Sequence, residues 1–420
     1  MKRATLDRRA WLVWGVGVGV YLTAVLHRSS MAVAGILARE RFDITAAQLA
    51  TFMMLQLLMY ALAQVPVGVL LDRFGTRRLL AAGLLVTMVG QLGFAFAGTF
   101  AQALVFRAFV GIGDALIFIS VIRLVMMWFD PHIIPLLTQI TGTMGQAGGI
   151  LAAIPMTLMF ANLGWTTTYV ILAGFSVVML VFLVLFVHDS PTKKRLSGDS
   201  LSISTVKQNV LEAWAHPGTR LGFWTHFTTQ FSANAFMLIW GFPFLVRSEN
   251  YSETVASGLL TVGVISAMLS GPILGTASAR FAYHRSSMVL TIVSVVALIW
   301  TFVLAWPGDA PLWLLTILVV SLGVAGPASL IGLDFSRAFN PGYRAGTAIG
   351  LVNQAGFFAT VILIIAMGLI LDWQTGGGAF TSEAFTWAFS AQYVLWAIGG
   401  FQILRYRRRT RALVASQATE

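Results

Sequence analysis

Long apolar stretches separated by short polar loops run through the whole chain. The stretches from Leu12 to Leu26, Leu79 to Ala97 and Tyr169 to Val187 carry no charged residue, and apolar flanks extend each of them. A helix needs about 20 apolar residues to cross the hydrocarbon core of a membrane. The pattern predicts twelve membrane-spanning helices. They cover approximately residues 11–37, 46–71, 78–98, 101–128, 133–161, 166–187, 220–246, 252–279, 286–306, 312–336, 343–371 and 382–404.

Composition agrees with an all-α integral membrane protein. Hydrophobic residues make up 57% of the chain and charged residues only 10%, whereas soluble domains carry about 25% charged residues. The surface therefore has to meet the lipid bilayer. A net charge of +11 would suggest nucleic acid as a partner of a soluble protein, but here the basic residues lie in short loops, so no such partner is expected. The chain has no cysteine, which excludes thiolate metal sites, and no metal or organic cofactor is expected.

The distribution of basic residues predicts the orientation. With both termini in the cytoplasm, most of the 27 Lys and Arg residues fall in inner segments, while Arg39, Arg41 and Arg247 fall in outer ones. Such a bias is typical of multi-pass proteins of the cell membrane. The polar loop 188–219 then separates a six-helix half, 1–187, from a second half, 220–404, and residues 405–420 form a basic cytoplasmic tail.

Two segments of the chain resemble each other. The end of the second predicted span and the end of the eighth align without gaps, and Gly68, Arg73, Phe74 and Arg78 recur as Gly275, Arg280, Phe281 and Arg285. Ala279 stands in the second copy where the first has Asp72. An internal repeat of a six-helix unit indicates a transporter with two halves and a site near the midplane.

The first copy carries a recognisable motif. Its residues are Gly68, Asp72, Arg73, Gly75, Arg77 and Arg78, spaced Gly-x-x-x-Asp-Arg-x-Gly-x-Arg-Arg. This pattern resembles the signature loop of the major facilitator superfamily. The resemblance implies that these residues form a conformational latch on the cytoplasmic side and that Arg77 pairs with Asp130. It also implies a monomer.

A further resemblance concerns three predicted spans. Arg107 is followed by Gly111, Gly113 and Asp114, Arg28 lies late in the first span, and Gln56, Tyr60 and Gln64 follow one another in the second. These features are similar to the anion:cation symporter branch, which moves organic acids with protons or sodium. That branch usually has an acid before the first-span Arg, where this chain has His27. Gln146 stands where exporters of the superfamily typically have Pro, which favours uptake.

Charges within spans are expensive, about 2.5–3.5 kcal/mol each on insertion scales, so each calls for a reason. Arg107 and Asp114 are two helical turns apart and share a face, and Arg28 lies at a similar depth. We expect the three to line a cavity, with Arg28 binding a substrate carboxylate and Asp114 carrying the proton. Alternatively, Arg107 and Asp114 form a static pair. Arg123 is expected to snorkel or to pair with Asp130.

Neutral polar residues within spans are further candidates. The predicted substrate-binding set is Arg28, Gln56, Tyr60, Gln64, Arg107, Gln146, Gln230, Asn234 and Asn353. The amides could equally join helices, at about 0.6 kcal/mol each. Asp334 and Arg337 are expected to form a structural or gating pair.

The leading hypothesis is a transporter, and no catalytic residues are expected. It would take up a small organic anion with H+ as the coupling ion, by alternating access of its two halves. An exporter of cationic or amphipathic compounds is the alternative, favoured by 12% aromatic residues. A membrane enzyme is disfavoured because the six His are scattered and no loop holds paired carboxylates or a Gly-rich phosphate motif. A receptor would need a sizeable soluble domain.

Overall fold

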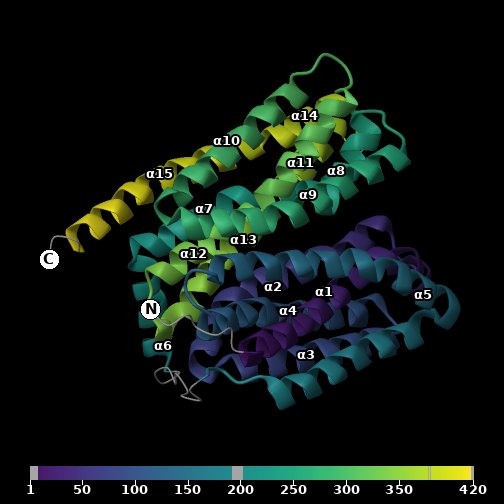
Figure 1. Cartoon of the computed structure of the whole chain (residues 1–420). Coiled ribbons are helices and arrows are strands. Elements are labelled where there is room, and N and C mark those ends of the chain that lie inside the picture. Colours follow the sequence, from purple (N-terminus) through teal and green to yellow (C-terminus); the bar gives the residue numbers. More distant parts are fainter. Residues whose placement is uncertain (1–7, 192–201, 377, 379, 418–420) are drawn as a thin grey trace. The chain divides into compact units, whose positions relative to one another are not determined.

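The computed structural model describes residues 8–191, 202–376, 378 and 380–417, and every regular element among them is a helix (Figure 1). Ten of these helices are long and apolar enough to cross a membrane. The prediction of an all-α membrane protein is confirmed.

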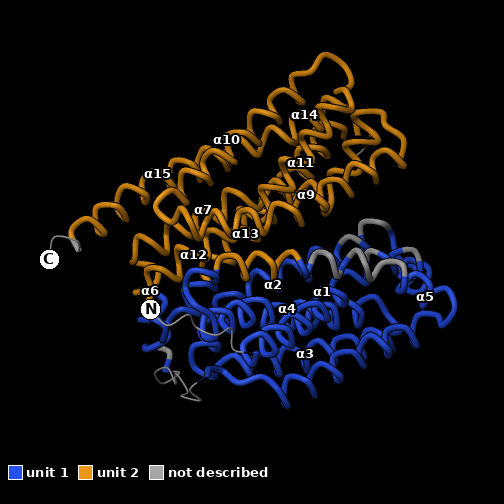
Figure 2. Tube along the Cα trace, viewed as in Figure 1, with its two compact units in different colours: residues 1–134, 144–211, 341–350 blue, residues 135–143, 212–340, 351–420 orange. Residues whose placement is uncertain are grey.

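The chain divides into two compact units, coloured separately in Figure 2. Unit 1 holds residues 1–134, 144–211 and 341–350, and unit 2 holds residues 135–143, 212–340 and 351–420. Each unit therefore includes one short segment from the other part of the chain, at the start of α5 (Ile134–Phe186) or of α13 (Ala345–Thr375). The segment at the start of α13 contacts Asp72, and the segment at the start of α5 packs against Gly275.

Unit 1 is built around one buried helix. Three other helices pack on α4 (Phe100–Trp128), namely α1 (Arg8–Phe42), α2 (Ala46–Phe74) and α3 (Thr76–Phe96). The apolar window of α4 is 83% buried, more than in any other candidate span. Small residues allow this close packing, since a Cβ added at Gly113 would lie 2.8 Å from the backbone nitrogen of Thr87 and 2.9 Å from the Gly83 oxygen. Glycine at such positions lets membrane helices approach closely.

One helix of unit 1 is interrupted. The long α5 contains a non-helical residue, Gly164, with φ of 72° and ψ of −175°. Only glycine adopts this conformation readily. The break lies between the fifth and sixth predicted spans, 133–161 and 166–187.

Unit 2 contains α7 (Pro217–Ala235), α9 (Glu253–Arg280), α10 (Arg285–Leu304), α11 (Leu312–Ala328), α12 (Ile331–Ala338), α14 (Ser382–Ser390) and α15 (Gln392–Gln417). It also contains the short 3-10 turn η3 (Ala282–His284) and α13 from residue 351 onwards, while η4 (Gly342–Arg344) and the first turns of α13 belong to unit 1. Beyond α7 the helix continues through two π-helical turns, η1 (Phe236–Trp240) and η2 (Phe244–Ser248), separated by α8 (Gly241–Pro243). The span containing Gly326 and Pro327 is broken soon afterwards, because α11 ends at Ala328 and α12 begins at Ile331.

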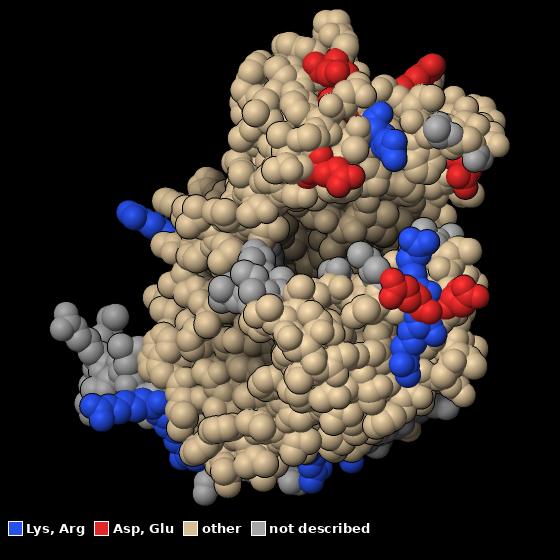
Figure 3. Space-filling view, turned by 90° about the vertical axis from the view of Figure 1, so that its right-hand side faces the viewer, with Lys and Arg blue, Asp and Glu red and all other residues tan. Residues whose placement is uncertain are grey.

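The surface is suited to lipid. Large apolar side chains are exposed on the helices, among them Leu185 on α5 and Leu269 and Ile273 on α9, each more than 60% accessible. Charged side chains occupy only a few small groups on the face shown in Figure 3. Exposed apolar patches of this kind mark a membrane-facing surface.

Two helical features lie outside the predicted spans. α6 (Ile203–Ala215) forms within the loop predicted at 188–219, and α15 continues to Gln417 although the last span was expected to end near residue 404. Residues 192–201 of that loop, which include Lys193, Lys194 and Arg195, lie outside the described residues.

Candidate functional site

An ion pair joins α1 and α4 within unit 1. Arg28 Nη1 lies 3.2 Å from Asp114 Oδ2, and the side chains are 37% and 1% exposed, respectively. Neither oxygen of Asp114 accepts a hydrogen bond from the part of the chain that the structure describes. A buried carboxylate without hydrogen bonds is costly to keep charged. Asp114 therefore depends on Arg28 for its stabilisation as an anion.

Tyr21 lies near Arg28. It is buried on the same helix, α1, and the two side chains interact electrostatically. A Cβ added at Gly145 on α5 would lie 2.8 Å from Tyr21 Cζ, so the ring is held closely by the neighbouring helix. Arg28 is thus held by Asp114 while part of its side chain stays accessible.

Arg107 has a different environment from Arg28. It is fully buried, and its guanidinium donates to the backbone oxygens of His27 and Arg28, to Ser30 Oγ and to Gln56 Oε1. Its Cζ also lies 5.4 Å from the ring centroid of Phe94. No ion pair joins Arg107 to Asp114 in the described structure. Arg107 therefore ties α1 and α2 to α4, and its charge is enclosed.

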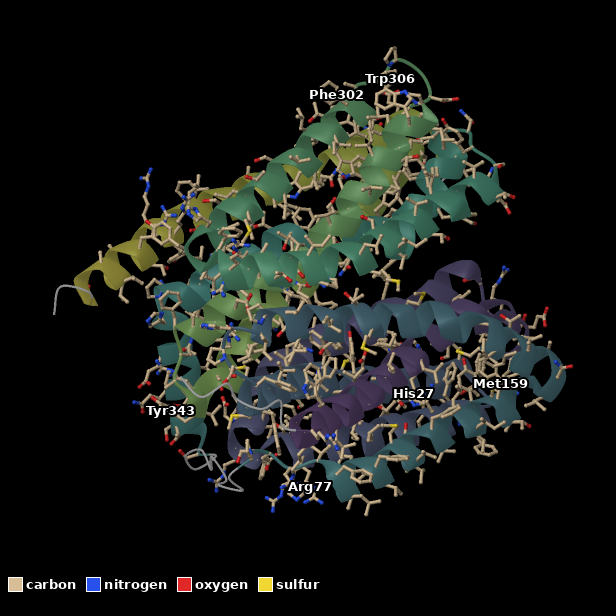
Figure 4. The ribbon with its side chains drawn as sticks, in the orientation of Figure 1. His27, Arg77, Met159, Phe302, Trp306 and Tyr343 are labelled. Atoms are coloured by element: carbon tan, nitrogen blue, oxygen red, sulfur yellow. The ribbon has the colours of Figure 1, made fainter. Side chains whose placement is uncertain are left out.

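His27 occupies a second buried polar position on α1 and lies inside the helices of unit 1 in Figure 4. Gln91 Nε2 donates to His27 Nδ1 over 2.9 Å, and His27 Nε2 lies 2.8 Å from Ser176 Oγ. Because Nδ1 accepts from the amide, Nε2 carries the proton and donates to the serine. Both ring nitrogens are thus used by a neutral imidazole, which links α1, α3 and α5.

The polar interior of unit 2 is neutral. His226 Nδ1 donates to the Ser329 oxygen over 2.9 Å, Ser232 donates to Gln392 Oε1 over 2.7 Å, and Asn234 donates to Thr360 Oγ1 over 3.4 Å. Asn353 is also buried, and Gln230 Oε1 has no described hydrogen-bond partner. The described spans of this unit carry their charged residues only near their ends.

Asp72 is the centre of the contact between α2 and the start of α13. Its two oxygens accept from the backbone nitrogens of Gly346 and Thr347, over 2.9 Å and 2.7 Å, and from Thr347 Oγ1 over 2.7 Å. Arg123 of α4 completes the arrangement, with Nη1 2.7 Å from Asp72 Oδ1. A carboxylate at a helix N-terminus satisfies free N–H groups and complements the helix dipole.

Two predictions about this region were wrong. Arg123 neither snorkels nor pairs with Asp130, because it is buried and bound to Asp72. Arg77, at the edge of unit 1 in Figure 4, does not pair with Asp130. Its backbone nitrogen donates to Asp189 Oδ1 over 2.7 Å, and its side chain donates to the Val184 oxygen. Asp130 itself is exposed.

Unit 2 has its own ionic group at the corresponding end. Asp334 accepts from Ser278 Oγ over 2.6 Å and from Arg337 Nη2 over 3.2 Å, and Arg285 Nε lies 4.0 Å from the same carboxylate. The structure therefore brings Asp334 and Arg337 together, and adds a partner from α10 that their spacing did not indicate.

The sequence as a whole matches a known family. The family model described as Major Facilitator Superfamily covers residues 16–364. The chain belongs to the major facilitator superfamily. It is accordingly a multi-pass membrane transporter and not an enzyme.

Relatives of this major facilitator include transporters named for organic anions. It is 26% identical over 182 residues to a probable sulfoacetate transporter of Cupriavidus necator, a match that covers 43% of this chain and 42% of the relative. It is 28% identical over 167 residues to a D-galactonate transporter of Escherichia coli, covering 38% of each chain. An uncharacterized transporter of Bacillus subtilis is 20% identical over 387 residues, covering 86% of this chain and 87% of that one.

Solved structures of major facilitators share its fold. The transporter FucP in the outward conformation superposes with a TM-score of 0.71 at 13% identity, covering 94% of this chain and 99% of that one. The proton:xylose symporter XylE gives a TM-score of 0.68 at 15% identity, covering 95% of both chains. At these identities the likeness concerns the fold.

The structure distributes the predicted site residues over two units. Arg28 and Asp114 are brought together, and Gln56 Oε1 accepts a hydrogen bond from Arg107. Gln64 Nε2 donates to the Tyr60 backbone oxygen over 3.1 Å. Gln230, Asn234 and Asn353 lie in unit 2, and the side chain of Gln146 lies outside the described residues. Sequence reasoning missed Tyr21, Gln91 and Ser176. Gln91 gave a signal, as a lone amide in an apolar span, whereas a tyrosine or a serine in a membrane helix gives little.

Proposed function

We propose that this major facilitator takes up a small organic anion together with protons. It would have twelve spans with both termini in the cytoplasm of the cell, and would work as a monomer by alternating access. The observation that carries the proposal is the Arg28–Asp114 pair, which combines an accessible cation with a buried acid lacking hydrogen-bond donors among the described residues. Relatives named for sulfoacetate and galactonate support an organic anion as the substrate.

Arg28 is the residue that binds the anionic group. Its guanidinium stays charged at any physiological pH, and its planar fork matches the two oxygens of a carboxylate or sulfonate. Over a third of its side chain is accessible, whereas Arg107 is enclosed. Arg107 acts instead as a positioning residue, because it holds the α1 carbonyls of His27 and Arg28 next to the binding group.

Asp114 is the proton carrier. An anion that binds Arg28 competes with Asp114 for the same cation, and the displaced carboxylate would be left charged in an apolar interior. Taking up a proton relieves that cost. Substrate and proton therefore bind together, and release of the substrate restores the ion pair.

The neutral residues provide specificity. Gln230 has a buried oxygen without a partner among the described residues, and Asn234 and Asn353 lie on neighbouring helices of unit 2. Amides of this kind can bind hydroxyl groups of a substrate without adding charge. The contact of Asp72 with the start of α13 serves as the latch, since its hydrogen bonds have to break when α2 and α13 separate.

A binding and uptake experiment tests the anion hypothesis. Purified protein is screened by thermal shift at pH 5.5 and 7.5 against D-galactonate, sulfoacetate and cationic drugs, and hits are tested for pH-driven uptake into proteoliposomes. A ligand at 100 times its dissociation constant stabilises by about 2.7 kcal/mol. Arg28→Gln should abolish the shift and the uptake. The matched control is Arg39→Gln, on the exposed end of the same helix, which should retain both. Stabilisation by cationic drugs that is unchanged in Arg28→Gln would contradict the proposal and favour the exporter.

The orientation is tested by labelling. Because the chain has no cysteine, single cysteines can be introduced without a background. Glu40→Cys, at the exposed end of α1, and Ser416→Cys, near the end of α15, are exposed to a membrane-impermeant maleimide on whole cells. We expect the first to react and the second to react only after lysis. The opposite result would reverse the proposed topology.

A further inference from the structure

Asp114 differs from the other buried acids of the described spans. Asp72 accepts three hydrogen bonds and an ion pair, and Asp334 accepts from Ser278 and Arg337. Asp114 has no hydrogen-bond donor among the described residues, although it is more deeply buried than either. An acid that is fully hydrogen-bonded as an anion gains little from a proton, whereas an acid held only by one ion pair gains from a proton once that cation is taken by another anion. One acid is therefore equipped to exchange a proton.

His27 does not add a second proton site. It lies next to Arg28 in the chain, but its Nδ1 accepts from the Gln91 amide and its Nε2 is used by Ser176. Protonation of Nδ1 would require the Gln91 amide to turn its oxygen, which has no partner among the described residues, towards the ring. It would also place a second positive charge beside the buried guanidinium of Arg107, which hydrogen-bonds the His27 carbonyl. The imidazole therefore stays neutral through the cycle.

The positive charges indicate one anion-binding group, as the acids indicate one proton carrier. Arg28 is partly accessible, while Arg107 and Arg123 are buried and are bound by Gln56 and Asp72. Within unit 2, the described spans carry neutral amides and hydroxyls at their middle. One cation can neutralise one anionic group. A second anionic group on the substrate would be desolvated without a partner, which costs several kcal/mol.

We infer that the transporter moves one proton with one monovalent anion, so that each cycle carries no net charge. This inference rests on the proposed function and specifies its substrate class and stoichiometry. In the empty state Arg28 is a cation and Asp114 is an anion, so this pair has no net charge. In the loaded state Arg28 is paired with the substrate anion and Asp114 is protonated, so these groups again have no net charge, and the charge of Arg107 is the same in both states. Both the anion and the proton leave on release, and the ion pair re-forms.

Measurement of uptake against membrane potential tests this stoichiometry. Full-length protein in proteoliposomes is given an inward pH gradient, with the potential set by potassium and valinomycin to zero or to about 60 mV inside-negative. The probes are the monovalent anions D-galactonate, glycolate and benzoate, and the divalent anions sulfoacetate and malonate. One net charge per cycle would change accumulation about tenfold per 60 mV. We expect monovalent accumulation to be equal within about twofold at the two potentials, and divalent probes to be taken up at least about tenfold less.

Failure of this inference is distinguishable from failure of the proposed function. If no anion in the panel is taken up with a pH gradient, the proposed function falls and the inference with it. If a monovalent anion is taken up but accumulates about tenfold more at the inside-negative potential, more than one proton moves and only the stoichiometry is overturned. Preferential uptake of a divalent anion would overturn the substrate class.

Asp114→Asn provides an independent check because it keeps the shape of the side chain and removes the proton. The variant should still exchange labelled anion across the membrane, which shows that it is folded. Its net uptake should lose the pH dependence and should fall about tenfold at 60 mV inside-negative, because the anion then crosses alone. Unchanged pH-driven accumulation in this variant would assign the proton to another group and overturn the inference. Loss of exchange in an Asp114→Asn variant that unfolds at the wild-type temperature would overturn it as well, because binding would then require the charged acid.

Discussion

Two helix contacts related by the internal repeat differ in how they are held. In unit 1, Gly68 of α2 packs against the start of α13, and an added Cβ would lie 2.9 Å from the carbonyl carbon of Gly346. In unit 2, Gly275 of α9 packs against the start of α5, and an added Cβ would lie 2.8 Å from Leu136 Cα. The close backbone approach is common to both. Only the first is reinforced by a carboxylate, since Ala279 replaces the acid in the second copy.

This difference shows that the repeat preserves packing more strictly than charge. The α9–α5 contact has a neutral hydrogen bond nearby, from Gln139 Nε2 to the Pro327 oxygen over 2.8 Å. At the corresponding end of unit 2 the buried acid lies on α12 and not on α9. This residue, Asp334, binds Ser278, Arg285 and Arg337, and none of these three belongs to α5. We expect the two contacts to respond very differently to substitution, although their glycines are equivalent.

The largest effect is expected from Asp72→Asn. The substitution leaves Arg123 buried without its counter-ion. It also replaces one acceptor oxygen by an amide NH2, so that either both donors of Thr347 or the Gly346 nitrogen and Arg123 lose their acceptor. Removing one partner of a buried ion pair costs about 3–5 kcal/mol. Thermal unfolding of purified protein in detergent measures the loss, with the exposed Asp130→Asn as a control expected to stay within about 0.5 kcal/mol of wild type. An unchanged unfolding temperature for Asp72→Asn would show that the charge does not hold this contact.

An intermediate effect is expected when the glycines are replaced. Gly68→Ala should destabilise by about 1–3 kcal/mol, because the added methyl meets backbone atoms of Gly346 and Thr347. Gly275→Ala should cost less, since one of its three nearest atoms is the movable Gln139 Cγ. Gly258→Ala on α9 is the control, since nothing lies within 4 Å of its added Cβ. Unfolding temperatures should follow the order Gly258→Ala, Gly275→Ala, Gly68→Ala, from highest to lowest, and equal losses at Gly68 and Gly275 would contradict the proposed asymmetry.

The smallest effect is expected from restoring the missing acid. Ala279→Asp places a carboxylate at the repeat position of Asp72, near the start of α5, whose first turn has no side-chain cap. A charge at a helix N-terminus stabilises by about 0.3–1 kcal/mol. The measurement is again the unfolding temperature, compared with Ala279→Asn, which can cap but carries no charge. If Ala279→Asp raises the unfolding temperature more than Ala279→Asn does, and the difference shrinks at high salt, the charge of Asp72 is what distinguishes the two contacts. A lower unfolding temperature for Ala279→Asp would show that the α9–α5 contact excludes an acid.

Much of the fold could be predicted because it follows from hydrophobic length. Apolar stretches, the repeat of Gly68 and Gly275, and the motif at Asp72 were sufficient for the family, which is confirmed. The α6 helix was missed because it lies in a polar segment, where no membrane-length apolar pattern exists. The extension of α15 was missed because arginines continue a helix as readily as they end a span.

The candidate site was less predictable, because spacing along one helix does not specify partners on another. Arg123 lies two turns from Asp130, yet its partner Asp72 is on α2. Arg107 shares a face with Asp114, but backbone carbonyls of α1 and the side chain of Gln56 surround its guanidinium. Backbone oxygens have no signature in a sequence, so an enclosed arginine and an accessible one look the same. The prediction that joins Arg28 and Asp114 rests on their similar depth and on the resemblance to the symporter branch, and neither indicates which of the two contacts water.

The π-helical turns after α7 have a mechanical consequence. A π turn is closed by an i→i+5 hydrogen bond and an α turn by an i→i+4 bond, so a π turn contains one residue more. The turns η1 and η2, which flank the segment from Gly241 to Pro243, therefore contain one extra residue each. If one turn tightened to α geometry, the helix beyond it would rotate by about 100°, the angle of one residue. Side chains such as Val246 and Arg247 would then face a different neighbour, while the i→i+5 backbone hydrogen bonds of the turn would be replaced by i→i+4 bonds. A change between π and α geometry in this segment would therefore rotate one end of the helix while the other end keeps its orientation.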